Sequence, residues 1–192
     1  MTATDEPHRA DHPEWVFGYG SLMWRPGFDW LERHRAILHG RHRRLCVWSW
    51  HHRGRPHAPG LVMGLDRGGA CIGIAYRIDP DKRVAVRAYL DARERVTPVY
   101  LATGVGLRLP DGRRVQALTY IVDRQNPQYA GRISVDTAVQ TVRHAVGESG
   151  PNPAYVHETA AHLREIGVRD PFMEAVDNEL RRSRMPDGPE PL

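Results

Sequence analysis

The apolar positions in the first two thirds of the chain follow the short runs that are typical of β-strands. A run at residues 15–17 leads into a loop with two glycines, and residues 31–40 and 41–52 predict two extended segments with a bend near Gly40. In the second of these segments apolar side chains fall on both faces, as expected of a central strand.

Two pairs of apolar runs predict two hairpins. The first pair is residues 61–65 and 71–78 around a turn at 66–69, and the second is residues 100–109 and 113–122 around Pro110-Asp111-Gly112. Asp-Gly between two apolar runs is a strong hairpin signal. Short strands joined by glycine-containing turns, with further glycines inside them, favour a small barrel or a strongly curled sheet.

Apolar residues at helical spacing first occur between the two predicted hairpins, and they dominate the last third of the chain. Acidic residues at 79 and 81 suit the positive end of a helix dipole, and Ser134 can cap a second helix. The predicted helices cover residues 80–95, a segment from 134 that ends near Gly147, residues 154–166 and residues 171–184.

This order, with strands first and helices mostly last, predicts the α+β class. We expect a flexible N-terminal arm at residues 1–13, a single domain at residues 14–184 and a flexible tail at residues 185–192. A chain of 192 residues is long enough for one hydrophobic core.

Composition and termini favour a protein of the cytoplasm. The sequence holds no apolar run near the roughly 18 residues of a membrane span, and its polar N-terminus lacks a secretory pattern, so we expect no membrane partner. Cys46 and Cys71 lie in apolar runs and are interpreted as buried small side chains rather than as a disulfide framework.

The basic charge does not by itself indicate nucleic-acid binding. The formal net charge is +4 and the pI is near 9.4, but the arginines are spread along the chain, acids nearly balance them, and no nucleic-acid-binding motif occurs. Lys82 is the only lysine, so most positive charge is guanidinium, which suits contacts with carboxylates. A small acidic substrate is compatible with this composition, and no nucleic-acid partner is expected.

The glycine-containing loop is the first candidate for chemistry. Gly18-Tyr19-Gly20-Ser21 follows the first strand, and such a loop can direct several backbone N–H groups at one anionic or polarised oxygen. An ordinary turn after an edge strand explains two glycines equally well. The Gly-x-Ser-x-Gly elbow is absent, so Ser21 is expected to bind substrate rather than to act as a nucleophile.

Glu94 is the second candidate. On a helix it shares a face with Leu90 and Val86, so its carboxyl should be partly desolvated, and desolvation raises the pKa of a carboxyl towards the range of a general acid/base. The alternative is an acid near the helix end that reaches water or pairs with an arginine. Asp91, between Arg87 and Arg95 at spacings of four, has the pattern of a solvated salt-bridge face.

A series of motifs runs through the chain beyond these candidates. They are Phe17-Gly18-Tyr19-Gly20-Ser21-Leu22-Met23-Trp24, Arg43-Arg44, Cys46-Val47-Trp48-Ser49, His52-Arg53-Gly54, Pro59-Gly60-Leu61-Val62, Gly73-Ile74-Ala75-Tyr76-Arg77, Ala88-Tyr89-Leu90-Asp91 with Arg93-Glu94, Leu118-Thr119-Tyr120-Ile121, Asn126-Pro127-Gln128-Tyr129-Ala130-Gly131 and Ser149-Gly150-Pro151-Asn152. In this order, over roughly residues 15–167, the sequence resembles the ChaC-type glutathione-specific gamma-glutamylcyclotransferases.

The resemblance implies a small mixed β-barrel flanked by helices, a lyase that releases 5-oxoproline and Cys-Gly from glutathione, and no cofactor. It also implies a substrate loop at Tyr19, Gly20, Ser21 and Leu22, with Glu94 as the catalytic residue. Residues 96–100, directly after the glutamate, depart from the family pattern, which leaves the preference for the leaving group open.

Further side chains are candidates for holding the carboxylates of the substrate: Arg44, Arg53, Tyr120 and Tyr129. A structural role is an equal alternative for each tyrosine. His51, His52 and His57 lack acidic or cysteine partners at ligand spacing, so no metal site is expected. Two other functions stay open, a cyclotransferase for other γ-glutamyl amines or amino acids and a non-catalytic γ-glutamyl-binding module.

Overall fold

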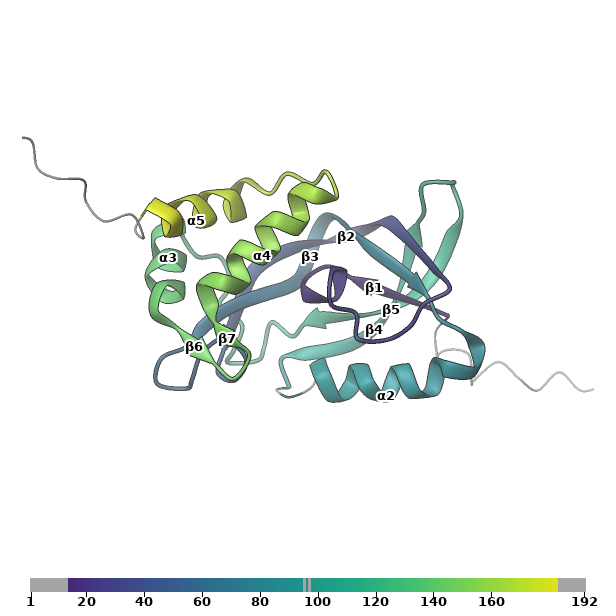
Figure 1. Ribbon diagram of the computed structural model, residues 1–192, viewed down its shortest axis with the longest axis horizontal. Helices are drawn as coiled ribbons and strands as arrows, with labels where there is room; N and C mark the ends of the chain where they lie inside the picture. Colours follow the sequence, from purple (N-terminus) through teal and green to yellow (C-terminus); the bar gives the residue numbers. More distant parts are fainter. Residues whose placement is uncertain (1–13, 95, 97, 183–192) are drawn as a thin grey trace, which may run out of the picture. The chain divides into compact units, whose positions relative to one another are not determined.

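The computed structural model describes residues 14–94, 96 and 98–182. In chain order the elements are β1 (Trp15–Gly18), the 3₁₀ turn η1 (Ser21–Met23), β2 (Glu32–Ser49), β3 (Gly60–Arg77), the 3₁₀ turn η2 (Pro80–Lys82), α2 (Arg83–Glu94), β4 (Tyr100–Arg108), β5 (Arg114–Val122), α3 (Val135–His144), β6 (Val146–Gly147), β7 (Gly150–Pro151), α4 (Asn152–Glu165) and α5 (Pro171–Arg182) (Figure 1). The expected arm at 1–13 and tail at 185–192 lie outside the described residues.

Five strands close into a barrel in the order β1-β3-β2-β4-β5. The barrel is mixed, since β1 pairs antiparallel with β3 and parallel with β5, while β4 and β5 form an antiparallel hairpin over their full length. The predicted α+β class and the predicted barrel are therefore confirmed.

The chain divides into two compact units. The first holds residues 1–44 and 63–127, and the second holds residues 45–62 and 128–192. Both divisions fall inside strands, between Arg44 and Leu45 in β2 and between Val62 and Met63 in β3. A single domain over residues 14–184 stays a prediction.

In the first unit, alternation along the strands sends apolar side chains to the core. Phe17, Leu38, Ile74 and Leu118 are almost fully buried, one from each of four strands. The helix expected at residues 80–95 forms as η2 followed by α2, and the Asp79 carboxylate caps it by accepting from the Asp81 N–H at 3.0 Å. Residue 95 itself lies outside the described residues.

The prediction of two extended segments before residue 52 is wrong. A single 18-residue strand, β2, runs from Glu32 to Ser49 through the expected bend. Gly40 takes a φ of +78° there, and a Cβ at this position would meet nothing within 4 Å. Because glycine adopts this conformation without a steric penalty, the strand continues past it.

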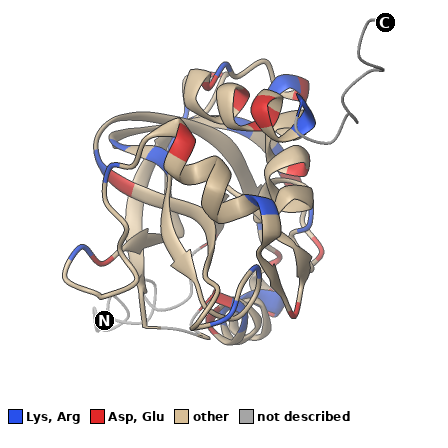
Figure 2. Ribbon diagram, turned by 90° about the vertical axis from the view of Figure 1, so that its left-hand side faces the viewer, with Lys and Arg blue, Asp and Glu red and all other residues tan. Residues whose placement is uncertain are grey.

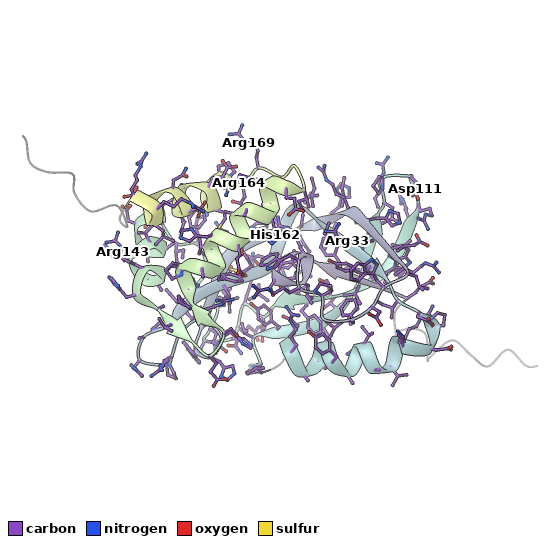
Figure 3. All side chains as sticks on the ribbon, viewed as in Figure 1. Arg33, Asp111, Arg143, His162, Arg164 and Arg169 are labelled. Carbon is purple, nitrogen blue, oxygen red and sulfur yellow. The ribbon has the colours of Figure 1, made fainter. Side chains whose placement is uncertain are left out.

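The first predicted hairpin is wrong for a related reason. Residues 60–77 form one strand, β3, and Gly68 and Gly69 lie within it at φ of +94° and +67°. Asp66 lies in β3 rather than in a turn, and its buried carboxylate accepts from the Arg124 Nε at 2.6 Å and from the Arg67 N–H at 2.7 Å. The second hairpin is confirmed, with Asp111 at its tip between β4 and β5 (Figure 3).

The second unit contains α3, α4 and α5, each packed against the other two (Figure 1). Ser134 caps α3 as predicted, since its hydroxyl accepts from the Thr137 N–H at 3.1 Å. The short antiparallel pair β6–β7 was not predicted from the sequence. Its strands have two residues each, too few to show an apolar pattern.

A buried carboxylate joins α4 to α5. Asp177 is 1% exposed and contacts His157 Nδ1, Arg181 Nε at 3.2 Å and Arg164 Nη1 at 3.4 Å. Figure 3 shows Arg164 projecting from α4. Burial alone would raise the pKa of Asp177, but the hydrogen bonds from His157 and Arg181 outweigh it and hold the pKa below its usual value.

Three further observations concern the cysteines, the distribution of charge and the helices. Cys46 and Cys71 are both buried and free, as predicted. Positions of both charge signs are interspersed along the ribbon (Figure 2). None of the helices in the described part of the chain is long and apolar enough to cross a membrane.

Candidate active site

The candidate loop begins where β1 ends. A Cβ at Gly18 would lie 2.9 Å from the Leu22 Cβ, so only glycine allows the chain to fold back this closely. Gly20 has φ −124° and ψ −133°, and the η1 turn that follows closes with a bond from the Met23 N–H to the Gly20 carbonyl at 2.9 Å. The first N–H groups of such a turn have no partner within it.

Carbonyl oxygens of this loop are held by side chains of β2 and β3. Arg43 Nε donates to the Tyr19 carbonyl, and its Nη2 donates to the Ile72 carbonyl at 2.7 Å. The hydroxyl of buried Tyr76 lies 3.0 Å from the Leu22 carbonyl and 2.8 Å from the Met23 carbonyl, and burial raises the pKa of Tyr76. The loop backbone is therefore fixed from its carbonyl side.

Glu94 lies on the last turn of α2, on the face predicted for it. Val86 and Leu90 on that face are buried, and the Glu94 side chain is 19% exposed. Burial raises the pKa of Glu94, and the neighbouring guanidinium of Arg93 opposes this only in part. The expected desolvation of this carboxyl is confirmed, whereas its role as a catalytic group stays a prediction.

Arg93 links the loop to Glu94. Its Nη2 donates to the Ser21 hydroxyl at 2.9 Å, its Nη1 donates to the Arg25 carbonyl at 2.6 Å, and its Nε lies 3.2 Å from Glu94 Oε1. One guanidinium thus brings Ser21 and Glu94, two residues separated by 73 positions in the sequence, to a common partner.

Tyr120, another predicted binding residue, is held by Asp91. Its buried hydroxyl donates to Asp91 Oδ1 at 2.8 Å, while Arg87 Nε donates to Asp91 Oδ2 at 2.8 Å. Burial first, and then the carboxylates of Asp91 and Glu94, raise the pKa of Tyr120. The predicted salt bridge between Arg87 and Asp91 is confirmed, but the predicted solvation of this face is wrong. Both side chains are half-buried, and Asp91 also holds a buried tyrosine that periodicity cannot reveal.

The other predicted binding residues are distributed over both units. Arg44 is half-buried in β2 next to Arg43, within the first unit. Arg53 and Tyr129 belong to the second unit, where Arg53 is buried, donates to the Pro151 carbonyl at 3.2 Å and lies over the Tyr155 ring at 5.4 Å. Half-buried Tyr129 pairs with Val47 through an isolated bridge. A substrate contact by any of these residues stays a prediction.

The histidines considered as metal ligands have other neighbours. His51 Nε2 lies 3.2 Å from Glu148 Oε2, and His52 Nδ1 lies 3.0 Å from the Ser149 hydroxyl. Within residues 14–94, 96 and 98–182, no three His, Cys, Asp or Glu side chains form a group that could hold a metal ion.

Two arginines central to this site were missed by the sequence reasoning. Arg43 and Arg93 each stand beside a residue that was singled out, Arg44 and Glu94, and both lie within the motifs that carry the resemblance. Strand alternation gave a usable signal, since Arg43 and Arg44 must point to opposite faces of β2. It could not say which of the two faces holds the loop.

The barrel fold has counterparts among solved structures. The fold matches the crystal structure of a selenomethionine-labelled, glutathione-specific gamma-glutamyl cyclotransferase from yeast, with a TM-score of 0.79 and 24% identity over 88% of this chain and 96% of that chain. This likeness defines the class of fold, that of the gamma-glutamylcyclotransferases.

The family follows from the sequence as a whole. The family model described as ChaC-like protein matches residues 14–183, and the chain therefore belongs to the ChaC family. The glutathione-specific gamma-glutamylcyclotransferase of Escherichia coli is 33% identical over 191 residues, 98% of this chain and 83% of that protein. Human glutathione-specific gamma-glutamylcyclotransferase 1 is 31% identical over 84% of this chain and 76% of that protein. The resemblance in the motifs is confirmed.

Proposed function

We propose that this protein is a γ-glutamylcyclotransferase that cleaves glutathione to 5-oxoproline and Cys-Gly, with Glu94 as the general acid/base. The observation that carries the proposal is the half-buried carboxyl of Glu94, whose pKa is raised and which shares the Arg93 guanidinium with Ser21 of the loop. Membership of the ChaC family and the glutathione-specific relatives support the choice of substrate.

The reaction needs no nucleophile from the protein. The α-amine of the γ-glutamyl group attacks its own γ-carbonyl carbon and closes a five-membered lactam, and the amide bond to the cysteine nitrogen breaks. One proton must leave the attacking amine and one must reach the departing nitrogen. A single carboxyl can carry out both transfers, so the net reaction leaves the enzyme unchanged.

A raised pKa suits Glu94 to this double task. A carboxyl with an ordinary pKa is a weak base at neutral pH and is rarely protonated there, whereas desolvation brings the two forms closer in free energy. Burial of the carboxyl supplies that desolvation. The position of Glu94 at the end of α2, beside a fixed arginine, gives the proton carrier a defined place.

The loop would bind the carbonyl that is attacked. The N–H groups at the start of η1 are free of intrahelical partners, and they are the donors that we assign to the developing oxyanion. Arg43 and Tyr76 occupy carbonyl oxygens of the loop, which keeps the backbone in one conformation before substrate arrives. Such preorganisation lowers the cost of reaching the transition state.

We assign the substrate carboxylates to the arginine and tyrosine side chains predicted from the sequence: Arg44, Arg53, Tyr120 and Tyr129. The proposal includes no cofactor, no nucleic-acid partner and a location in the cytoplasm.

The test measures 5-oxoproline formation from glutathione by the purified protein and by Glu94→Gln. Loss of the proton carrier should lower kcat at least about 100-fold, within the usual range for general acid–base catalysis. Glu165→Gln is the matched control, because this side chain is 69% exposed and pairs with His162 on its own helix. Full turnover by Glu94→Gln would refute the assignment of Glu94.

A second candidate is a cyclotransferase for other γ-glutamyl amines or amino acids. The departure from the family pattern at residues 96–100 favours keeping it, since this segment directly follows Glu94. Parallel assays with γ-Glu-Cys and a γ-glutamyl amino acid separate the two, because a glutathione-specific enzyme requires the complete tripeptide. Binding of glutathione without product from any substrate would instead identify a binding module.

A further inference from the structure

We propose that Arg93 is the positioning residue of this site: one guanidinium holds the candidate substrate loop and the Glu94 carboxyl in the relative positions that the reaction requires. The inference rests on the proposed function and adds to it a residue that acts through its neighbours rather than on the substrate. All the contacts involved lie within the first unit.

All three nitrogens of the guanidinium have separate tasks. Nη2 binds the Ser21 hydroxyl at 2.9 Å, and Nε lies 3.2 Å from Glu94 Oε1. Nη1 binds the Arg25 carbonyl at 2.6 Å and the Tyr89 hydroxyl at 2.9 Å, with the Pro26 carbonyl at 3.4 Å. The group therefore bridges both ends of the segment 21–26 and the proton carrier.

Only arginine has the shape for this arrangement. The guanidinium is planar and presents five N–H donors in a fixed fork, whereas a lysine ammonium is a point charge on a flexible stem. A lysine at residue 93 would keep the positive charge near Glu94 but could not bind Ser21 and Arg25 in the same geometry. Charge and positioning can thus be separated by substitution.

The loop packs closely around the same contact. A Cβ at Gly27, which has φ +76°, would lie 1.9 Å from the Tyr89 hydroxyl, so the chain passes directly over the side chain that receives Arg93 Nη1. Phe28 packs edge-on against Tyr89, with ring centroids 6.4 Å apart. The loop therefore packs closely against α2, and Arg93 provides the hydrogen bonds that hold it there.

The charge of Arg93 acts on Glu94 in a defined direction. Burial raises the pKa of Glu94, and the guanidinium lowers it. Nearby titratable groups include Tyr89, which binds Arg93 Nη1, and Tyr120, whose pKa Glu94 helps to raise; Asp91 is paired with Arg87. Removing the Arg93 charge should therefore raise the pKa of Glu94 further, since no other cation contacts its carboxylate within the described residues.

The experiment compares Arg93→Lys, Arg93→Met and the wild type in 5-oxoproline formation from glutathione across pH. Arg93→Met should lower kcat/KM about 10- to 100-fold, as expected for a lost positioning contact, and move the acid limb of kcat/KM to higher pH, because the cation that lowers the pKa of Glu94 is gone. Arg93→Lys should keep the acid limb of the wild type while its KM rises and its kcat falls. Arg182→Met, which removes an exposed ion pair with Glu179, is the control and should match the wild type.

A double-variant cycle guards against a merely structural effect. If Arg93 acts through Ser21, the losses of kcat/KM in Ser21→Ala and Arg93→Met should be less than multiplicative when combined. Unchanged kcat/KM and an unchanged acid limb in both Arg93 variants would overturn the inference, as would an equal shift of the acid limb in the two. A wild type that forms no 5-oxoproline would instead refute the proposed function.

Discussion

At the scale of single residues, the candidate site depends on buried polar groups that are costly to keep. Glu94 carries a carboxyl in a position that disfavours its charge, and Tyr120 points a hydroxyl into the core towards Asp91. Groups with shifted pKa values often collect where a protein performs chemistry. Both groups can be tested without an activity assay.

Glu94 should make folding less favourable as pH rises. Its pKa is raised in the folded state, so the folded protein holds this proton more tightly, and stability falls as pH increases from the unfolded value near 4.3 through the folded value. Glu94→Gln has no such titration. We expect Glu94→Gln to be more stable than the wild type at pH 7 and to lose this advantage below about pH 4.

Urea denaturation at several pH values measures this difference. Exposed Glu165 serves as control, and Glu165→Gln should track the wild type at each pH. A Glu94→Gln variant less stable than the wild type at pH 7 would contradict the desolvation of Glu94.

Tyr120→Phe should lower the free energy of unfolding by about 1–2 kcal/mol, because a buried hydrogen bond to a carboxylate is lost. The same bond is removed in Asp91→Asn, so the two losses should not add in the double variant. Chemical denaturation of the two single variants and the double variant measures the coupling. Fully additive losses would mean that the hydroxyl and the carboxylate stabilise the fold independently.

At the scale of elements, glycines decide where strands continue and where backbones meet. Gly40, Gly68 and Gly69 sit inside long strands at positive φ, where the sequence suggested interruptions. Gly54 has a different purpose, since a Cβ there would lie 2.1 Å from the Gly60 nitrogen and 2.4 Å from the Ser49 carbonyl oxygen. The loop between β2 and β3 therefore closes through backbone contact.

Gly54→Ala should destabilise the protein by about 3 kcal/mol or more, because backbone must move to admit the methyl group. The matched control is Gly104→Ala in β4, where a Cβ would meet nothing within 4 Å. That substitution should stabilise the strand by about 0.5–1 kcal/mol through the lower entropy of the unfolded chain. Thermal unfolding compares the two, and equal effects would refute the close approach at Gly54.

Asp177→Asn should weaken the packing of α5 on α4 and lower the free energy of unfolding by about 3 kcal/mol near neutral pH. The pKa of Asp177 is lowered in the folded state, so its stabilisation is complete above the unfolded value near 3.9 and disappears as pH falls through the lower folded value. The difference in free energy of unfolding between the wild type and Asp177→Asn should disappear in that acidic range, as urea denaturation at several pH values would show. Glu179→Gln, at an exposed pair with Arg182, should cost at most about 1 kcal/mol.

At the scale of the whole molecule, neither compact unit is a continuous stretch of chain. The helices of the second unit require residues 45–62, since the Asn152 side chain accepts from the Leu61 N–H at 2.6 Å and donates to the Leu61 carbonyl at 2.8 Å. The Trp48 N–H likewise donates to the Gln128 carbonyl at 2.8 Å. Fully buried Asn152 thus takes the place of a strand neighbour for Leu61.

A fragment of residues 128–192 should therefore not fold alone. Without residues 45–62 it exposes the core faces of its helices and leaves Asn152 unpaired, so its circular dichroism should show no cooperative thermal transition. The full chain, measured at the same concentration, should unfold cooperatively. A fragment that melts at the temperature of the full chain would show that α3, α4 and α5 suffice for this unit.

Local chemistry in the sequence determined much of this protein. Spacings of one to four residues predict the helices, the Ser134 cap, the Asp-Gly hairpin and the apolar face that buries Glu94. Interactions over such short spacings do not depend on where the rest of the chain lies. The succession of motifs likewise identified the family, because each motif is a local pattern in a fixed order.

The tertiary structure alone decided which residues meet across long separations. Nothing local distinguishes Arg43 from Arg44 as the partner of the Tyr19 carbonyl, or shows that Arg93 reaches Ser21. The local sequence placed Asp66 in a turn, because it gives no sign of the partner of Asp66, Arg124, which lies 58 positions away. Pairings of this kind depend on closure of the barrel, and a period of two or 3.6 residues carries no information about which distant side chain fills a given place.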